Sequence, residues 1–198
     1  MQRTKETNKG FTLVELIVVI VILAILAAIL IPQLLGYIDR AKTNQYILDG
    51  KNVLTATQSE TAQMYALGEA AGLTGKEGTS NPHGDVNWMK TERAKRILET
   101  ADVDPYMVIV GMGDYATYKD TQPHKPYTVY FIAYWAAPDV PPVFFDGTKW
   151  TTEYPWKGNG ANTFESKGEN VKMQFYFLKG PSNNMTSNWN TLKKYLGI

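Results

Sequence analysis

The chain has 198 residues, enough for one domain of ordinary size with a sizeable core. Its 20 Lys and Arg residues balance its 19 Asp and Glu residues, so overall charge does not indicate a nucleic-acid-binding protein. The absence of cysteine excludes disulfides, thiolate metal sites and thiol catalysis.

An unbroken apolar run lies near the N-terminus, where every residue from Leu16 to Ile31 is apolar. As a helix, the stretch from Phe11 to Ile31 would span roughly 30 Å, the thickness of a bilayer core. The preceding residues carry a net positive charge, which favours a cytoplasmic location for the N-terminus and places the rest of the chain outside. The sequence therefore predicts a single membrane-spanning helix.

Two ordinary interpretations of this run remain, a cleaved secretory signal peptide and a plain signal anchor. A secretory signal has a shorter apolar region followed by a small-residue cleavage site. The run here is longer, and the residues that follow it, Pro32-Gln33-Leu34-Leu35-Gly36, do not form such a site. Hydropathy alone does not exclude the second interpretation, a plain signal anchor.

Glu15 is the unusual residue of the stretch from Phe11 to Ile31, because it is the only charged one. A charged group at the centre of a bilayer costs about 2.5–3.5 kcal/mol on insertion scales, and such residues are functional by default. No basic side chain within the segment can pair with Glu15. If the chain were cut just before Phe11, however, a new α-ammonium group would lie four residues away, and a neighbouring copy would carry another.

The stretch Lys9-Gly10-Phe11-Thr12-Leu13-Val14-Glu15-Leu16 resembles the type IV prepilin signature. That signature has a short basic leader ending in Gly, then Phe-Thr-Leu-x-Glu and a long apolar helix. The resemblance implies cleavage by prepilin peptidase between Gly10 and Phe11, N-methylation of Phe11, and binding of Glu15 to the Phe11 amine of the preceding subunit. Pairing would compensate two buried charges at once.

The resemblance implies a structural subunit of a type IV pilus, serving adhesion, surface motility or biofilm formation. It would be a single-pass membrane protein before assembly and part of an extracellular pilus afterwards. The implied partners are other copies of the chain, prepilin peptidase, a platform protein, an assembly ATPase and the membrane, with no specific nucleic acid. The lack of cysteine favours a Gram-positive source, because many Gram-negative pilins close their C-terminal region with a disulfide.

Three alternatives remain open. A pseudopilin of a type II secretion or competence system has the same leader and helix, and a minor tip pilin is the second possibility. The third, a membrane-anchored enzyme, would need a polar constellation in the globular part.

The expected fold is α+β, with a long N-terminal helix, half transmembrane and half packed, and an antiparallel β-sheet head. Pro32 and Gly36 are expected to break the helix. The resemblance implies that the helix unwinds at these residues when it is packed in the filament. The alternative is a static kink. Beyond these two residues, the apolar pattern predicts packing onto the head. It consists of a stripe of Leu34, Ile38, Ala41 and Leu48, with Ile47 and Leu54 a heptad apart beside it. The whole chain is expected to divide into five segments. They are a cleaved leader (1–10), the transmembrane and polymerisation half of the long helix (11–32), the amphipathic half of that helix (33–67), a loop with a short helix (68–105), and a β-sheet head with a C-terminal helix (106–198).

Within the head, a short helix is expected over Trp88–Ala101 and a closing helix over Trp189–Leu196, capped by Asn188. The expected strands are Tyr106–Met112, Tyr127–Trp135, a tight hairpin over Val143–Thr151 that turns at Asp146-Gly147, and Val171–Leu178. Glycine-rich or proline-rich loops are expected at Gly68–Asp85, Gly113–Pro126 and Thr152–Gly168.

The sequence shows no recognisable catalytic or metal-binding pattern and therefore predicts neither an enzyme nor a cofactor. His83 and His124 stand in proline-containing loops without metal-ligand spacing, and Asp102 and Asp104 lack the rest of a Ca²⁺ loop. We interpret the basic residues of the short helix as a solvated face rather than a DNA or glycan site; they are Lys90, Arg93, Lys95 and Arg96. Tyr37 and Tyr46 are interpreted as packing residues rather than as a conductive aromatic path.

Overall fold

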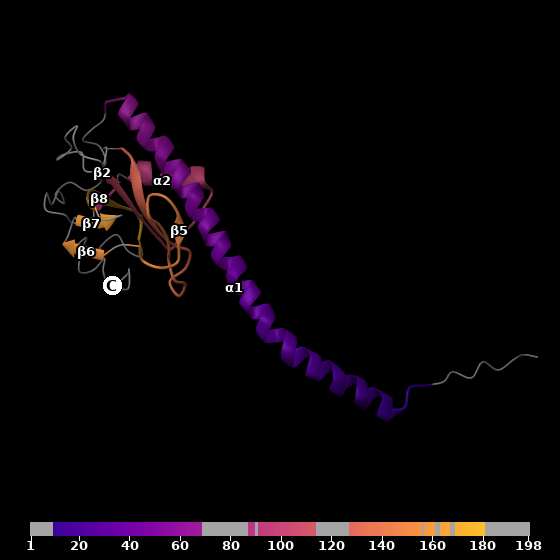
Figure 1. Ribbon diagram of the computed structural model, residues 1–198. Coiled ribbons are helices and arrows are strands. Elements are labelled where there is room, and N and C mark those ends of the chain that lie inside the picture. Colours follow the sequence, from indigo (N-terminus) through magenta and orange to yellow (C-terminus); the bar gives the residue numbers. More distant parts are fainter. Residues whose placement is uncertain are drawn as a thin grey trace, which may run out of the picture. The chain divides into compact units, whose positions relative to one another are not determined.

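The computed structural model describes residues 10–68, 87–89, 91–113, 127–155, 157–160, 163–166 and 169–180. The chain divides into two compact units, Met1–Lys42 and Thr43–Ile198, and the helix α1 (Leu13–Ala66) contributes residues to both (Figure 1). The expected closing helix over Trp189–Leu196 lies outside the described residues, as do His83 and His124.

In the first unit, α1 continues through Pro32 and Gly36. Proline has no N–H group, so the carbonyl of Ala28 loses its usual helical donor, yet the helix is maintained on both sides. The break at Pro32 and Gly36 is thus absent from the single subunit. As a property of the assembled filament it stays a prediction.

The second unit contains a sheet with the strand order β5-β4-β3-β2-β8-β7-β6. The neighbours along this path are antiparallel, whereas the short strand β1 pairs with β8 in parallel. The strands are β1 (Asn87–Trp88), β2 (Met107–Gly113), β3 (Val129–Trp135), β4 (Val143–Phe145), β5 (Trp150–Thr151), β6 (Lys157–Gly160), β7 (Thr163–Ser166) and β8 (Glu169–Lys179). The predicted α+β fold with a long helix and a predominantly antiparallel sheet is confirmed.

Side chains on both faces of the central strands are buried. Successive side chains of a strand point to opposite faces, so Val108 and Val110 of β2 join one apolar cluster while Met107 and Ile109 join another. The first cluster also contains residues of α1 and of α2 (Thr91–Ala101), and therefore lies on the helix-covered face of the sheet. The second is aromatic: Phe131 lies 5.7 Å from Phe175 and 6.2 Å from Phe144, measured between ring centroids.

The strand predictions were right for the centre of the sheet and wrong at its margins. The segment Thr152–Gly168 was predicted as a loop, but it contains β6 and β7. The helix predicted over Trp88–Ala101 begins at Thr91, since Asn87 and Trp88 pair with β8 instead. The missed strands are two to four residues long and carry little hydrophobic alternation, so sheet pairing decides their conformation.

The predicted hairpin is formed by β4 and β5, but its turn differs from the prediction. Phe145 pairs with Trp150, and the N–H group of Asp146 donates to the carbonyl of Lys149 at 3.1 Å, so the chain reverses at Gly147-Thr148, one residue later than predicted. One carboxylate oxygen of Asp146 accepts hydrogen bonds from the N–H groups of Thr148 and Lys149, both at 2.8 Å. The side chain thereby serves as the acceptor for the Lys149 N–H group, beside the backbone bond from the Asp146 N–H group.

The helix face predicted to pack on the head was right for Ile47 and Leu54, which pack against the helix-side core, and wrong for Leu48. Leu34, Ile38 and Leu48 are exposed. The buried residues of α1 are Gly50, Val53, Ala56, Thr57, Glu60, Thr61 and Met64. Several of these are small or polar, so an apolar stripe does not identify the face.

Candidate functional site

The peptide bond between Gly10 and Phe11 lies ahead of α1, which begins at Leu13. Both residues are exposed, and Phe11 keeps 87% of its surface accessible. A bond outside the helical hydrogen-bond ladder can enter a protease site without unwinding the helix. The geometry is thus suited to cleavage at the Gly10–Phe11 bond. The cleavage itself stays a prediction.

Thr12 and Glu15 cap the start of α1 reciprocally. The Thr12 N–H and hydroxyl groups donate to Oε2 of Glu15 at 2.8 Å and 2.6 Å, and the Glu15 N–H group donates to Oγ1 of Thr12 at 3.3 Å. This is a capping box, in which a Thr before the helix and a Glu three residues later satisfy otherwise unpaired backbone donors. Glu15 therefore has a local hydrogen-bond partner within its own chain.

Sequence reasoning considered Glu15 alone and overlooked Thr12. The available signal was the T-x-x-E spacing just before an apolar run, which marks a capping box. The capping box uses Oε2, and no described hydrogen bond involves Oε1. One carboxylate can therefore both cap its own helix and accept a bond from a second group.

The helix that follows is apolar around its whole circumference. The large apolar residues between Leu13 and Ile31 keep between about half and three quarters of their surface exposed, from 48% for Val19 to 73% for Leu13. Among the described residues, α1 is a helix long and apolar enough to cross a membrane. So large an exposed apolar surface requires lipid or protein to cover it.

The described residues of the head form no cluster that could hold a metal ion. No three His, Cys, Asp or Glu residues of that part of the chain lie close enough to hold a metal ion. Asp102 and Asp104 lie beyond the end of α2, and Asp104 forms an ion pair with Lys179. Tyr46 packs against the helix-side core, whereas Tyr37 is exposed.

Two basic residues of α2, Arg93 and Arg96, make structural ion pairs, which corrects the interpretation of the cluster as only a solvated face; Lys95 is exposed as predicted. Arg93 donates to Oε1 of Glu60 at 2.9 Å, and Arg96 also donates to Glu60. Glu60 lies on α1 and is only 7% exposed, so the two guanidinium groups join α2 to α1. Their hydrogen bonds lower the pKa of Glu60, with that from Arg96 the largest contribution. Lys95 pairs with Glu99 at the surface, and Lys90 lies outside the described residues.

Comparison with known proteins links these features. A family model described as the prokaryotic N-terminal methylation motif matches residues 7–31, which include Gly10, Phe11 and Glu15. The type II secretion system core protein G of Pseudomonas aeruginosa is 36% identical over 114 residues, covering 54% of this chain and 72% of that protein. The chain belongs to the family of type IV pilins and type II secretion pseudopilins.

Other members of this family show shorter similarity. The type IV major fimbrial protein FimA of Dichelobacter nodosus is 43% identical over 74 residues, which cover 37% of this chain and 40% of FimA. The type IV major alpha-pilin of Moraxella bovis is 32% identical over 95 residues, covering 41% of this chain and 57% of the alpha-pilin. The chain thus spans about two fifths of the FimA proteins it matches, and no solved structure matches it. None of these relatives supports the expected Gram-positive source.

Proposed function

We propose that this pilin-family chain is the precursor of a structural subunit that polymerises into a type IV pilus. The observation that supports this most is the exposed apolar part of α1, whose first turn is capped by the Glu15 carboxylate just after the accessible Gly10–Phe11 bond. In the membrane, lipid covers this helix, and in a filament other copies of the same helix do. The precursor is accordingly a single-pass membrane protein, and the assembled subunit is extracellular.

Assembly would proceed in three stages. Prepilin peptidase cuts after Gly10 and methylates the new amine of Phe11. The Glu15 carboxylate then accepts the Phe11 ammonium of the preceding subunit, while Thr12 continues to bind Oε2. A platform protein and an ATPase extract the subunit from the membrane. Within the filament, Pro32 and Gly36 allow the helix to unwind locally.

A second candidate function is a pseudopilin of a type II secretion system. It is favoured by the similarity to core protein G, of which the aligned residues cover 72%. The minor tip pilin and the competence pseudopilin have no comparable observation in their favour. All of these are structural roles.

The quantity of extracellular fibre distinguishes the two leading functions. Cells that produce the chain at its native level are sheared, and the fibres are collected and examined by electron microscopy and by immunoblotting. A pilus subunit should form long fibres that hold much of the total protein, and these would serve adhesion or surface motility. Protein retained in the membrane, with no more than short fibres, would contradict the pilus and favour the pseudopilin.

A further inference from the structure

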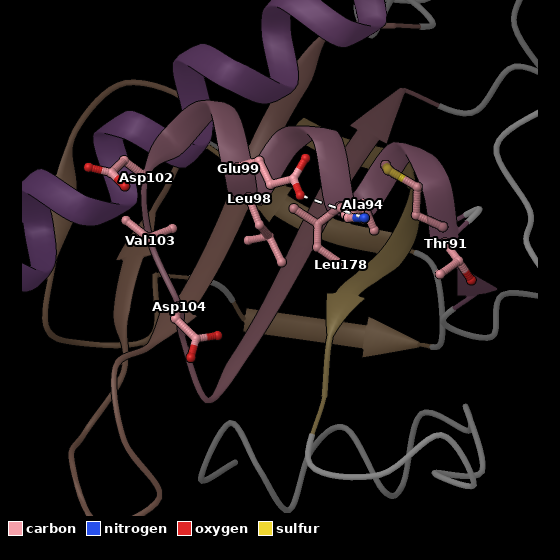
Figure 2. A pocket seen from close by; sticks show the side chains of 10 residues that line it. Thr91, Ala94, Leu98, Glu99, Asp102, Val103, Asp104 and Leu178 are labelled. Atoms are coloured by element: carbon pink, nitrogen blue, oxygen red, sulfur yellow. Dashed lines mark ion pairs between the residues drawn. The ribbon is translucent and has the colours of Figure 1, made fainter.

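A groove of about 660 Å³ lies between α2, the loop that follows it and the end of β8 (Figure 2). Its floor is apolar and includes Ala94 and Leu98 of α2 and Leu178 of β8. Its rim is charged and carries Lys95, Glu99, Asp102 and Asp104. None of its described lining residues comes from α1.

The rim of the groove is negatively charged. Lys95 compensates Glu99, and Lys179 compensates Asp104. In the part of the chain that the structure describes, Asp102 makes no ion pair. Asp102 also follows the C-terminus of α2, where the carbonyl groups add negative potential. The groove therefore suits a partner with an apolar side chain beside a cation.

The end of α2 is organised by the backbone. The N–H groups of Asp102 and Val103 donate to the carbonyls of Glu99 and Leu98, at 3.2 and 3.3 Å, as in a Schellman motif. Asp102 has a φ of 53°, in the left-handed region that glycine adopts most easily. The carboxylate of Asp102 thus has no evident role in ending this helix.

A complementary surface lies on α1. Leu48 is 52% exposed, and Lys51, one helical turn away, is exposed and makes no ion pair among the described residues. A single exposed leucine is ordinary on a protein surface. Leu48 gains significance here because it lies beside an uncompensated cation.

We propose that the groove of one subunit receives the Leu48–Lys51 face of a second copy, with Leu48 over the apolar floor and Lys51 beside Asp102. This inference rests on the proposed filament function. Because the two surfaces are different parts of the same chain, the contact is heterologous, and repetition of a heterologous contact that does not close gives an open helical assembly. The charges select the register, while the apolar contact contributes affinity.

Cysteine cross-linking in fibres of the full chain tests this contact, because the natural sequence has no cysteine. Lys51→Cys and Asp102→Cys subunits, distinguished by different tags, are co-expressed, and their fibres are oxidised. A bond between the two tags must join two chains. We expect a tag-to-tag dimer whose linked peptides contain positions 51 and 102, and much less product from either variant alone.

Charge variants give an independent readout. Asp102→Gly removes the carboxylate and relieves the left-handed backbone, so the head should remain at least as stable while fibre yield falls several-fold. Asp102→Lys should reduce the yield further, and adding Lys51→Asp should restore much of it. Asp139→Lys, an exposed aspartate away from the groove, is the matched control and should leave the yield unchanged.

The outcomes separate this inference from the proposed function. Normal fibres without the 51–102 product, or with unchanged yield in Asp102→Gly, would overturn the groove contact and leave the filament function standing. Cross-linking of position 102 to a different protein would also overturn it. If the natural chain forms no fibre at all, both proposals fall.

Discussion

The indole of Trp150 packs against Gly50 of α1 so closely that a side chain at position 50 would collide with it. A Cβ atom there would lie 2.4 Å from Cη2 of Trp150. Trp150 also packs on Phe145, with ring centroids 5.5 Å apart. Gly50 is therefore the site where the β4–β5 hairpin contacts the helix, since glycine permits a close approach.

We expect residues 34–198 to form a soluble, cooperatively folding domain when the apolar start of α1 is removed. Thr43–Ile198 forms a compact unit of its own, with buried side chains from α1, α2 and the sheet. Circular dichroism during heating should show a single transition. A fragment that stays aggregated in every buffer, or that loses its signal gradually, would contradict the expectation.

In this fragment, Gly50→Ala should destabilise the fold by about 1–2 kcal/mol. Overpacking typically costs about 1–3 kcal/mol, and the better helix propensity of alanine returns up to about 1 kcal/mol. Urea denaturation measures the change in the free energy of unfolding.

The background variant Trp150→Leu provides the control for this prediction. With the indole removed, Gly50→Ala should become neutral or stabilising, because only the helix propensity remains. A stabilising effect of Gly50→Ala in the natural background would show that Trp150 moves aside freely.

The Glu60 cluster should make the stability of the head dependent on pH. The pKa of Glu60 is lowered from its ordinary value near 4.5 by its bonds to Arg96 and Arg93. The unfolded chain therefore binds a proton at higher pH than the folded chain does. The stabilisation is complete above about pH 5 and is lost as the pH falls through the lowered folded-state pKa.

Glu60→Gln isolates this contribution. At pH 7 it should cost about 3 kcal/mol, the lower end for a broken buried pair, because glutamine keeps part of the hydrogen bonding. The difference in the free energy of unfolding between the Glu60→Gln variant and the natural fragment should become smaller below pH 4.5. Glu99→Gln removes an exposed pair with Lys95 and should cost less than about 1 kcal/mol. Equal costs for the two variants, or a pH-independent cost for Glu60→Gln, would refute the assignment.

The sequence predicted those features that rest on hydrophobic patterns. The apolar run, the central strands β2, β3 and β8 and the helix-plus-sheet fold follow from long, strongly apolar segments. The packed face of α1 did not follow, because it uses Gly50 against an indole and Glu60 against two guanidinium groups, contacts that depend on residues far along the chain. β1, β6 and β7 were missed for the same reason. At the candidate site, the motif predicts roles for Gly10, Phe11 and Glu15, whereas the capping role of Thr12 required the hydrogen-bond geometry.

Glu15 is expected to control assembly rather than folding. Glu15→Ala and Glu15→Gln should both be inserted and cleaved yet add poorly to fibres, because neither pairs with the Phe11 ammonium. Thr12→Val should cost about 1 kcal/mol of capping and lower the fibre yield less severely, while Thr12→Ser should behave like the natural chain. Quantitative blots of the fibre and membrane fractions measure each yield, and normal fibres from both Glu15 variants would contradict the role.

The intact mass of the subunit in purified fibres tests the central proposal most directly. Cleavage after Gly10 removes residues 1–10, so the fibre should yield a subunit that begins at Phe11 and carries one additional methyl group. Tandem mass spectrometry should place that methyl group on the α-amine of Phe11. A subunit that begins beyond Ile31, or one that retains residues 1–10 in the fibre, would contradict the assignment of this chain as a prepilin.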